Sequence, residues 1–421
     1  MTGHEPAAMT PLSTCSIGTQ TVDSNDYLSR NAAFYLLASI TISFLAGSIA
    51  PTPLYALYQR QWGFSPVTVT IIFGIYAISV LTALLFVGRL SDHLGRRPVL
   101  MAAIAAQTLT MVIFATASGV GELLLARIIQ GLATGAALGA VGAGMIDLNK
   151  ERGATANAVA PAFGTATGGL LAGFLVQYLP APTHLVYAVL GATFVLQGIG
   201  VALMEDTIAP APGALASLRP QLDLPTATRG PFLLALPVVA ASWALAGFYG
   251  SLGPMLLRGL LGVGSALLGG LALFVLAASA GLAVLTLQHR QPRDLMTFGA
   301  AMLAAGVGLT VWSLPHHAVA AFFAGTSIAG MGFGTGFQGA VRSIVAFAAP
   351  HERAGVLSVV FVVSYLSMGL PAIAAGVLVA RHGNILATGK EFGLVVMTLA
   401  LAAVLAAALR MARGRVPIAG Q

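Results

Sequence analysis

Long apolar stretches recur along the whole chain and are separated by short polar segments. Most of them reach or exceed the roughly 20 residues that a helix needs to cross about 30 Å of hydrocarbon. The pattern therefore predicts an all-α protein whose chain crosses a bilayer twelve times. The expected spans are 32–55, 66–87, 98–118, 121–145, 155–178, 184–203, 231–256, 263–286, 295–313, 317–346, 354–380 and 391–410.

One polar segment, 204–230, stands out because it holds four prolines and three acidic residues. It divides the spans into two groups of six, which predicts two pseudo-symmetric six-helix bundles joined by a solvent-exposed linker. Within the first span, Pro51 and Pro53 are expected to distort the helix near its end. The predicted organisation is a tail over 1–29, a bundle over 30–203, the linker over 204–230, a bundle over 231–410 and a tail over 411–421.

Composition supports a membrane protein and excludes several soluble classes. Charged residues make up 8% of the 421 positions and hydrophobic residues 57%, with a mean hydropathy of +0.89. A soluble globular protein averages about 25% charged residues. These values exclude a soluble enzyme, a disordered chain and a disulfide-stapled secreted domain. The single cysteine, Cys15, permits no internal disulfide.

The distribution of positive charge predicts the orientation in the membrane. Fifteen of the twenty Lys and Arg residues lie in or beside tails and loops that are predicted to be on the same side of the membrane as the linker. Four lie on the other side. Basic residues concentrate on the cytoplasmic side of membrane proteins, so both termini are expected to be cytoplasmic. Because these residues form no basic face or arm, no nucleic-acid partner is expected. Residues 1–29 lack the basic start and apolar core of a cleavable signal peptide.

The two halves also resemble each other in sequence. The run Lys-Glu-Arg-Gly at 150–153 precedes the fifth span, and His-Glu-Arg-Ala at 351–354 precedes the eleventh, an offset of 201 residues. Repeated halves are typical of transporters, in which the substrate site lies between the halves near the middle of the membrane.

The loop between spans two and three reads Gly-Arg-Leu-Ser-Asp-His-Leu-Gly-Arg-Arg-Pro over 88–98. It resembles the signature loop of the major facilitator superfamily, G-x-L-[SA]-D-x-x-G-R-R-P. Gly88 and Gly95 suit a tight reversal, and Asp92 can form charge-assisted hydrogen bonds with Arg96 and Arg97.

The resemblance implies that this loop latches the two bundles together on the cytoplasmic side. In the family, the aspartate corresponding to Asp92 interacts with neighbouring arginines and with the start of the eleventh helix, here near 353–356. The alternative is an ordinary basic loop that only sets the orientation of the chain.

Two further motifs lie inside predicted spans. Arg127, Gln130 and Gly131 match the family's R-x-x-Q-G pattern in the fourth helix. A charge at that depth is expensive, so Arg127 is expected to face the protein interior and to be paired, rather than to extend to the outer headgroups. In the fifth span, Gly164, Gly168 and Gly169 resemble the G-P-x-x-G-G motif of drug–proton antiporters, with threonine in place of proline; close helix packing alone would also explain them.

No acidic residue and no histidine falls in the middle of a predicted span. Glu122, five residues before Arg127, is the closest candidate for a proton-carrying partner, and its alternative is an exposed acid in a short loop. No nucleophile–base spacing, metal cluster or phosphate loop is found, so neither an enzyme nor a cofactor is predicted. Candidate substrate contacts are Tyr55, Tyr58, Gln107, Trp243 and Gln338.

These observations predict a monomeric secondary transporter of a bacterial inner membrane that exports small organic compounds, such as drugs, metabolites or siderophores. The expected mechanism is proton antiport with alternating access, so the partners are the substrate, protons and the bilayer. An alternative is uptake of a sugar or an organic acid, by proton symport or by facilitated diffusion. A receptor on the same fold is a third class, but the short tails leave no room for an added soluble domain.

Overall fold

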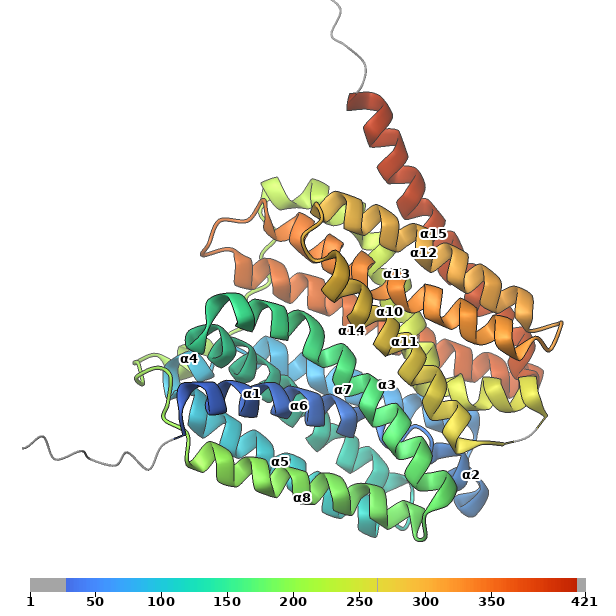
Figure 1. Cartoon of the computed structure of the whole chain (residues 1–421), viewed down its shortest axis with the longest axis horizontal. Coiled ribbons are helices and arrows are strands. Elements are labelled where there is room, and N and C mark those ends of the chain that lie inside the picture. Colours follow the sequence, from blue (N-terminus) through green and yellow to red (C-terminus); the bar gives the residue numbers. More distant parts are fainter. Residues whose placement is uncertain (1–27, 263, 415–421) are drawn as a thin grey trace, which may run out of the picture.

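The computed structural model describes residues 28–262 and 264–414, and every regular element in that part of the chain is a helix (Figure 1). Twelve of these helices are long and apolar enough to cross a membrane, which confirms the predicted number of spans. The predicted tails fall largely on 1–27 and 415–421, outside the described residues. In the first half the spans are α1 (Arg30–Ile49), α3 (Pro66–Phe86), α5 (Arg96–Thr116), α6 (Val120–Leu148), α7 (Lys150–Tyr178) and α8 (Pro182–Ala202).

The second half begins with the longest helix, which starts inside the predicted linker and carries three internal prolines. Three short helices, α2 (Tyr55–Trp62), α4 (Ser91–Leu94) and α9 (Ala214–Ser217), lie between the spans of the chain. The remaining spans are α10 (Thr226–Leu261), α11 (Ala266–Leu287), α12 (Pro292–Ser313), α13 (Val319–Val345), α14 (Arg353–His382) and α15 (Ile385–Gly414).

The first span is shorter than predicted because the chain breaks at Pro51 and Pro53. The helix α1 ends at Ile49 rather than continuing to residue 55, and α2 begins at Tyr55. Proline has no backbone N–H, so Pro51 cannot donate the hydrogen bond that a helix would supply to the Gly47 carbonyl. The break therefore leaves carbonyl groups at the end of α1 that need donors from elsewhere.

The helices α1–α8 and α10–α15 form two bundles that lie side by side (Figure 1). We call the end that holds α4 and the linker the linker end, and the end that holds α2 the opposite end. The two bundles meet along two helix pairs, α7 with α11 and α3 with α14. At the opposite end, the Thr52 hydroxyl donates to the Gly250 carbonyl at 3.0 Å, and Thr70 lies against Gly376. The bundles are thus closed against each other at the opposite end.

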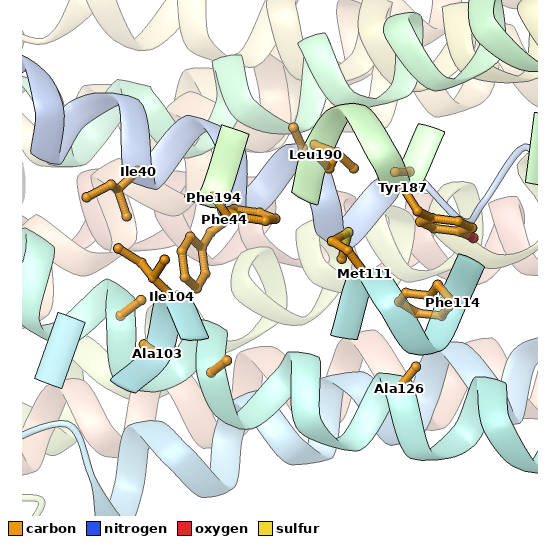
Figure 2. Packing of buried hydrophobic residues seen from close by; sticks show 14 of the residues in the cluster. Ile40, Phe44, Ala103, Ile104, Met111, Phe114, Ala126, Tyr187, Leu190 and Phe194 are labelled. Carbon is orange, nitrogen blue, oxygen red and sulfur yellow. The ribbon is translucent and has the colours of Figure 1, made fainter. Parts of the chain in front are cut away.

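Aromatic and branched side chains fill the core of the first bundle (Figure 2). Phe44 of α1 meets Phe194 of α8 edge to face, with ring centroids 5.2 Å apart. Phe114 of α5 stacks on Tyr187 of α8 at 5.0 Å. These contacts hold α1, α5 and α8 together and place the aromatic side chains beside the fourth span.

Candidate functional site

Arg127 lies in the interior of the first bundle and is completely buried. It stands seven residues after Val120, the first residue of α6, which places it about 10 Å from the opposite end of that helix. Its Nε and Nη2 atoms donate to the Tyr55 hydroxyl at 3.0 and 2.6 Å, and its Nη1 atom donates to Gln130 Oε1 at 2.6 Å. The prediction that Arg127 faces the interior agrees with this position, and the side chain does not extend to the membrane surface.

Arg127 and Gln130 also supply the donors that the broken end of α1 lacks. Arg127 Nη1 donates to the Ser48 carbonyl at 2.7 Å, and Gln130 Nε2 donates to the Gly47 carbonyl at 3.1 Å. The last carbonyls of a helix have no partner within the helix and carry partial negative charge. A guanidinium and an amide on α6 therefore cap α1 at the position where Pro51 interrupts it.

The charge of Arg127 is stabilised by neutral groups. The rings of Tyr55, Tyr76 and Phe114 surround the guanidinium carbon at 5.3–5.7 Å from their centroids. Such cation–π contacts contribute up to about 2 kcal/mol when desolvated. Among the described residues, the ion pairs involve Arg96 and no carboxylate pairs with Arg127. The expected pairing is thus made by hydroxyl, amide and carbonyl oxygens.

Glu122 performs a local role at the start of α6. Its carboxylate accepts hydrogen bonds from the backbone N–H of Gly119 at 2.9 Å and from the backbone and hydroxyl of Ser118. A carboxylate at this position satisfies free N–H groups and interacts favourably with the helix dipole. The structure therefore does not bring Glu122 to the Arg127 cluster, and its role as a proton carrier stays a prediction.

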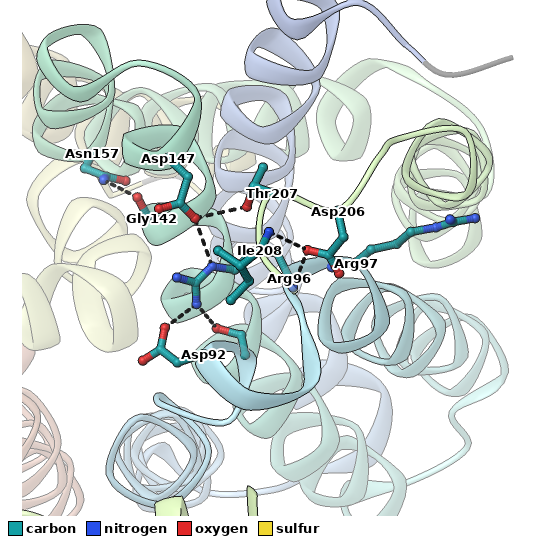
Figure 3. Close-up of polar contacts among 10 residues, drawn as sticks. Asp92, Arg96, Arg97, Gly142, Asp147, Asn157, Asp206, Thr207 and Ile208 are labelled. Carbon is teal, nitrogen blue, oxygen red and sulfur yellow. Dashed lines mark hydrogen bonds and ion pairs between the residues drawn. The ribbon is translucent and has the colours of Figure 1, made fainter. Parts of the chain in front are cut away.

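The signature loop is organised around Arg96, which is 6% exposed (Figure 3). Its guanidinium pairs with Asp92, donates to Ser91 Oγ at 2.8 Å, and contacts Asp147 of α6 at 3.2 Å. Sequence reasoning proposed Asp92 and missed Asp147. Asp147 lies in the last turn of α6. An acidic residue at that end of a predicted span, on the same side of the membrane as the basic loop, could have indicated this ion pair.

The linker docks on this loop through Asp206 (Figure 3). Asp206 accepts hydrogen bonds from the backbone N–H groups of Arg96 and Arg97, at 2.9 and 3.2 Å. Gly95 precedes α5 with φ of +98°, and any side chain there would collide with Asp206. Because Gly95 has no side chain to cap α5, an acid from the linker takes that role. Arg97 in turn donates to the Ala202 carbonyl at the end of α8.

Within the part of the chain that the structure describes, no hydrogen bond or ion pair joins the loop to residues 353–356. Asp92 pairs with Arg96 inside the first bundle, while Gly355 of α14 lies against Asp223 of the linker. The linker thus occupies the neighbourhood of the eleventh span. The latch stays a prediction for an arrangement in which the linker end is closed.

The glycines of the fifth span lie at two helix interfaces. Gly164 and Gly168 face the backbone of α1 at Ile42 and Ala46, and Gly169 faces the backbone of α11 at Gly270. A side chain at Gly168 would overlap the Ala46 backbone. These residues therefore allow α7 to approach both a helix of its own bundle and a helix of the other bundle.

The predicted substrate contacts fall in different parts of the molecule. In the first bundle, Tyr55 binds Arg127, and Tyr58 donates to the Tyr187 hydroxyl at 3.2 Å. Gln107 is fully buried beside Gly47, and neither of its side-chain polar atoms has a hydrogen-bond partner among the described residues. An unpaired buried amide is costly, so Gln107 is a candidate for contact with water or a ligand.

In the second bundle, Trp243 of α10 belongs to an aromatic cluster with residues of α13 and α14. Its ring lies 5.3 Å from Phe337, 6.2 Å from Phe333 and 5.1 Å from Tyr365. Its Nε1 is buried and has no acceptor among the described residues. Gln338 also has a buried unpaired oxygen, but no described contact joins it to Trp243. Gly131, the last residue of the R-x-x-Q-G motif, lies against α3 at Tyr76 and Ser79.

Comparison with known proteins supplies the family context. The profile of the Major Facilitator Superfamily matches residues 36–370. None of the curated proteins compared with the chain matches it. The fold is similar to an inward-facing structure of a bacterial homologue of the human lysosomal transporter Spinster, with a TM-score of 0.67, 16% identity, and coverage of 92% of this chain and 97% of that one. It is also similar to a point mutant of the nucleoside transporter NupG, with a TM-score of 0.64, 13% identity, and coverage of 90% of this chain and 99% of that one.

Proposed function

The chain belongs to the Major Facilitator Superfamily, and we propose that this membrane transporter exports small organic compounds by proton antiport. The substrate class comprises drug-like molecules, metabolites or siderophores. Alternating access would proceed by rocking of the two bundles about a site between them.

The position of the α7 glycines is the observation that carries this proposal. The segment 164–169 resembles the antiporter motif, and its glycines contact α1 on one face and α11 on the other. A helix with this position contacts both bodies that must move during transport. Its small residues support close sliding contact between them.

The positive charge of Arg127 in the first bundle favours substrates that are not multivalent cations. Arg127 is a completely buried cation, and its described partners are neutral. A substrate that approaches this cluster experiences a net positive field, because no described carboxylate cancels the charge. This supports a neutral, zwitterionic or anionic substrate over a multivalent cation.

Facilitated diffusion or proton-coupled uptake of a small metabolite is the second candidate. It is favoured by the absence of a carboxylate around Arg127 within the described residues, and by the capping role of Glu122. Proton carriers in transporters are commonly buried acids, and burial raises their pKa toward neutrality. Identification of a proton-carrying residue would therefore help to distinguish proton antiport from the second candidate.

We further propose that the transporter acts as a monomer in a bacterial inner membrane with its linker end in the cytoplasm. The distribution of Lys and Arg supports this orientation, because fifteen of twenty lie at linker-end segments.

The experiment that tests the proposal uses the full chain in liposomes that contain a pH-sensitive dye. A proton gradient is imposed, and drugs, sugars, organic acids and siderophores are screened for proton movement that depends on substrate. Proton movement opposite to substrate supports antiport, and its loss in Glu122→Gln would identify the carrier. Substrate flux without a proton signal contradicts antiport and favours the facilitated route.

A further inference from the structure

A groove of about 610 Å³ opens between α1 and α7 at the linker end, with Leu285 of α11 on its far side. Its volume lies in the range of small-molecule sites. The walls are mostly apolar, and two charged residues of α7, Glu151 and Arg152, stand at its mouth. The groove is separate from the Arg127 cluster and from the signature loop.

The groove lies where α1 and α7 of the first bundle meet α11 of the second, and exposed apolar side chains of α7 lie along it. Phe163 lines it and is 38% exposed, and Phe174 continues the same face of α7 with 47% exposure. The two residues are eleven positions apart, which is about three helical turns. In a membrane-spanning helix, an exposed apolar stripe of this kind is covered by lipid.

The charged residues at the mouth are available for a ligand. The Arg152 guanidinium stacks on the Phe34 ring, 5.0 Å from its centroid, and donates one hydrogen bond to the Tyr35 hydroxyl at 2.8 Å. These contacts hold it in place, and a guanidinium has further N–H donors to offer. The Glu151 side chain is exposed and has no hydrogen-bond or ion-pair partner among the described residues.

The depth of the groove matches one leaflet of a bilayer. Arg152 and Phe163 are eleven residues apart on α7, which corresponds to about 16 Å along the helix. Half of the hydrocarbon core is about 15 Å thick. If the first turn of α7 lies at the membrane surface, the two charges stand at headgroup level, and Ala156, Ala160 and Phe163 line the depth that an acyl chain would occupy.

We propose that this groove binds a phospholipid whose headgroup carries both a phosphate and a primary ammonium group. Arg152 binds the phosphate, Glu151 accepts hydrogen bonds from the ammonium, and one acyl chain packs against Ala156 and Ala160. One acid beside one base complements a zwitterionic headgroup better than an anionic one. A quaternary ammonium has no N–H to donate, so choline lipids lose the contact with Glu151.

The test uses the purified full-length protein in detergent, and it measures thermal unfolding with added phosphatidylethanolamine, phosphatidylcholine or phosphatidylglycerol of identical chains. Phosphatidylethanolamine is expected to bind about tenfold more tightly than the other two, and so to give the largest rise in midpoint temperature. Glu151→Gln should remove most of this preference, because Glu151 is the group that distinguishes the headgroups. Arg152→Gln should instead weaken the binding of all three lipids, because each of them carries a phosphate. Arg293→Gln, an exposed arginine in the first turn of α12, is the matched control and should not.

Other outcomes overturn the proposal. Equal shifts with all three lipids, or the largest shift with phosphatidylglycerol, would exclude recognition of a zwitterionic headgroup. A shift of the same size with water-soluble phosphoethanolamine would indicate a site for free aminophosphates. Ala160→Phe fills the groove and should abolish the lipid shift; native mass spectrometry of the lipid retained by the wild-type protein provides the same test without a variant.

Discussion

At the scale of single residues, Arg127 shows how the first bundle accommodates a buried charge. Its guanidinium is satisfied by a hydroxyl, an amide oxygen and a helix-terminal carbonyl, and aromatic rings surround it. Removal of one partner leaves the remaining buried groups without hydrogen bonds. The free-energy cost of those unpaired groups is larger than the net stabilisation that the hydrogen bonds provide. Arg127 is therefore a structural cap for α1 in addition to any role toward substrate.

Arg127→Lys is expected to destabilise the protein by about 3 kcal/mol and to impair transport. Lysine keeps the charge, but its compact ammonium group cannot reach the Tyr55 hydroxyl, the Gln130 side chain and the Ser48 carbonyl at the same time. The thermal midpoint and the flux of the substrate found in the liposome screen check this prediction. A variant with wild-type stability and flux would contradict the capping role, and Arg293→Gln serves as a control for the loss of an exposed arginine.

At the scale of elements, α7 combines close packing against two helices with one wall of the groove. Its glycines at 164 and 168 bring it against α1, and Gly169 brings it against α11. These are approaches of backbone to backbone, where one added methyl group has no free space. Another face of the same helix carries two exposed aromatic residues, Phe163, which lines the groove, and Phe174.

Gly168→Ala is expected to lower stability by about 1–3 kcal/mol, because the new Cβ overlaps the Ala46 backbone. The matched control is Gly191→Ala in α8, where a Cβ would meet Met111 at an ordinary 3.6 Å. That control should be neutral or gain up to about 1 kcal/mol from helix propensity. Equal thermal midpoints for the two variants would contradict the tight interface.

The signature loop offers a second prediction at this scale. Asp92→Asn should reduce transport while it leaves stability within about 1 kcal/mol of wild type, because Arg96 retains Asp147 and Ser91. Flux and thermal midpoint are measured on the same preparation. Full transport activity would reject the latch, and a large loss of stability would show that Asp92 acts within the first bundle instead.

At the scale of the whole molecule, contacts between the two bundles close the structure at the opposite end. Thr52 with Gly250 and Thr70 with Gly376 join the bundles there. Alternating access requires these contacts to break as contacts at the linker end form. A covalent link across them should therefore stop the cycle.

A disulfide between Thr70→Cys and Gly376→Cys, in a Cys15→Ser background, is expected to abolish transport until it is reduced. A Cβ at position 376 would lie 3.1 Å from the Thr70 Cβ, so small shifts bring the pair into disulfide geometry. Met111→Cys with Gly191→Cys, whose Cβ atoms would lie 3.6 Å apart inside one bundle, is the control and should preserve transport. Unimpaired flux in the oxidised double variant at positions 70 and 376 would show that this interface does not open.

The sequence by itself determined the features that depend on local chemistry. The number and order of the spans follow from runs of apolar residues, and the break in α1 follows from prolines that lack an N–H. The glycine-rich character of the fifth span is equally local. The predicted end of the first span was wrong, since hydropathy continues past Pro51 while helical hydrogen bonding does not.

Only the tertiary structure decided which residues meet. Arg96 pairs with Asp147 and receives Asp206 at its backbone, 51 and 110 positions away along the chain. Two partners of Arg127, the Ser48 carbonyl and the Tyr55 hydroxyl, come from α1 and α2, and the groove is made by α1, α7 and α11 together. Such contacts depend on how helices are placed against one another, and in a membrane that placement is set by small-residue packing and buried polar groups rather than by hydropathy.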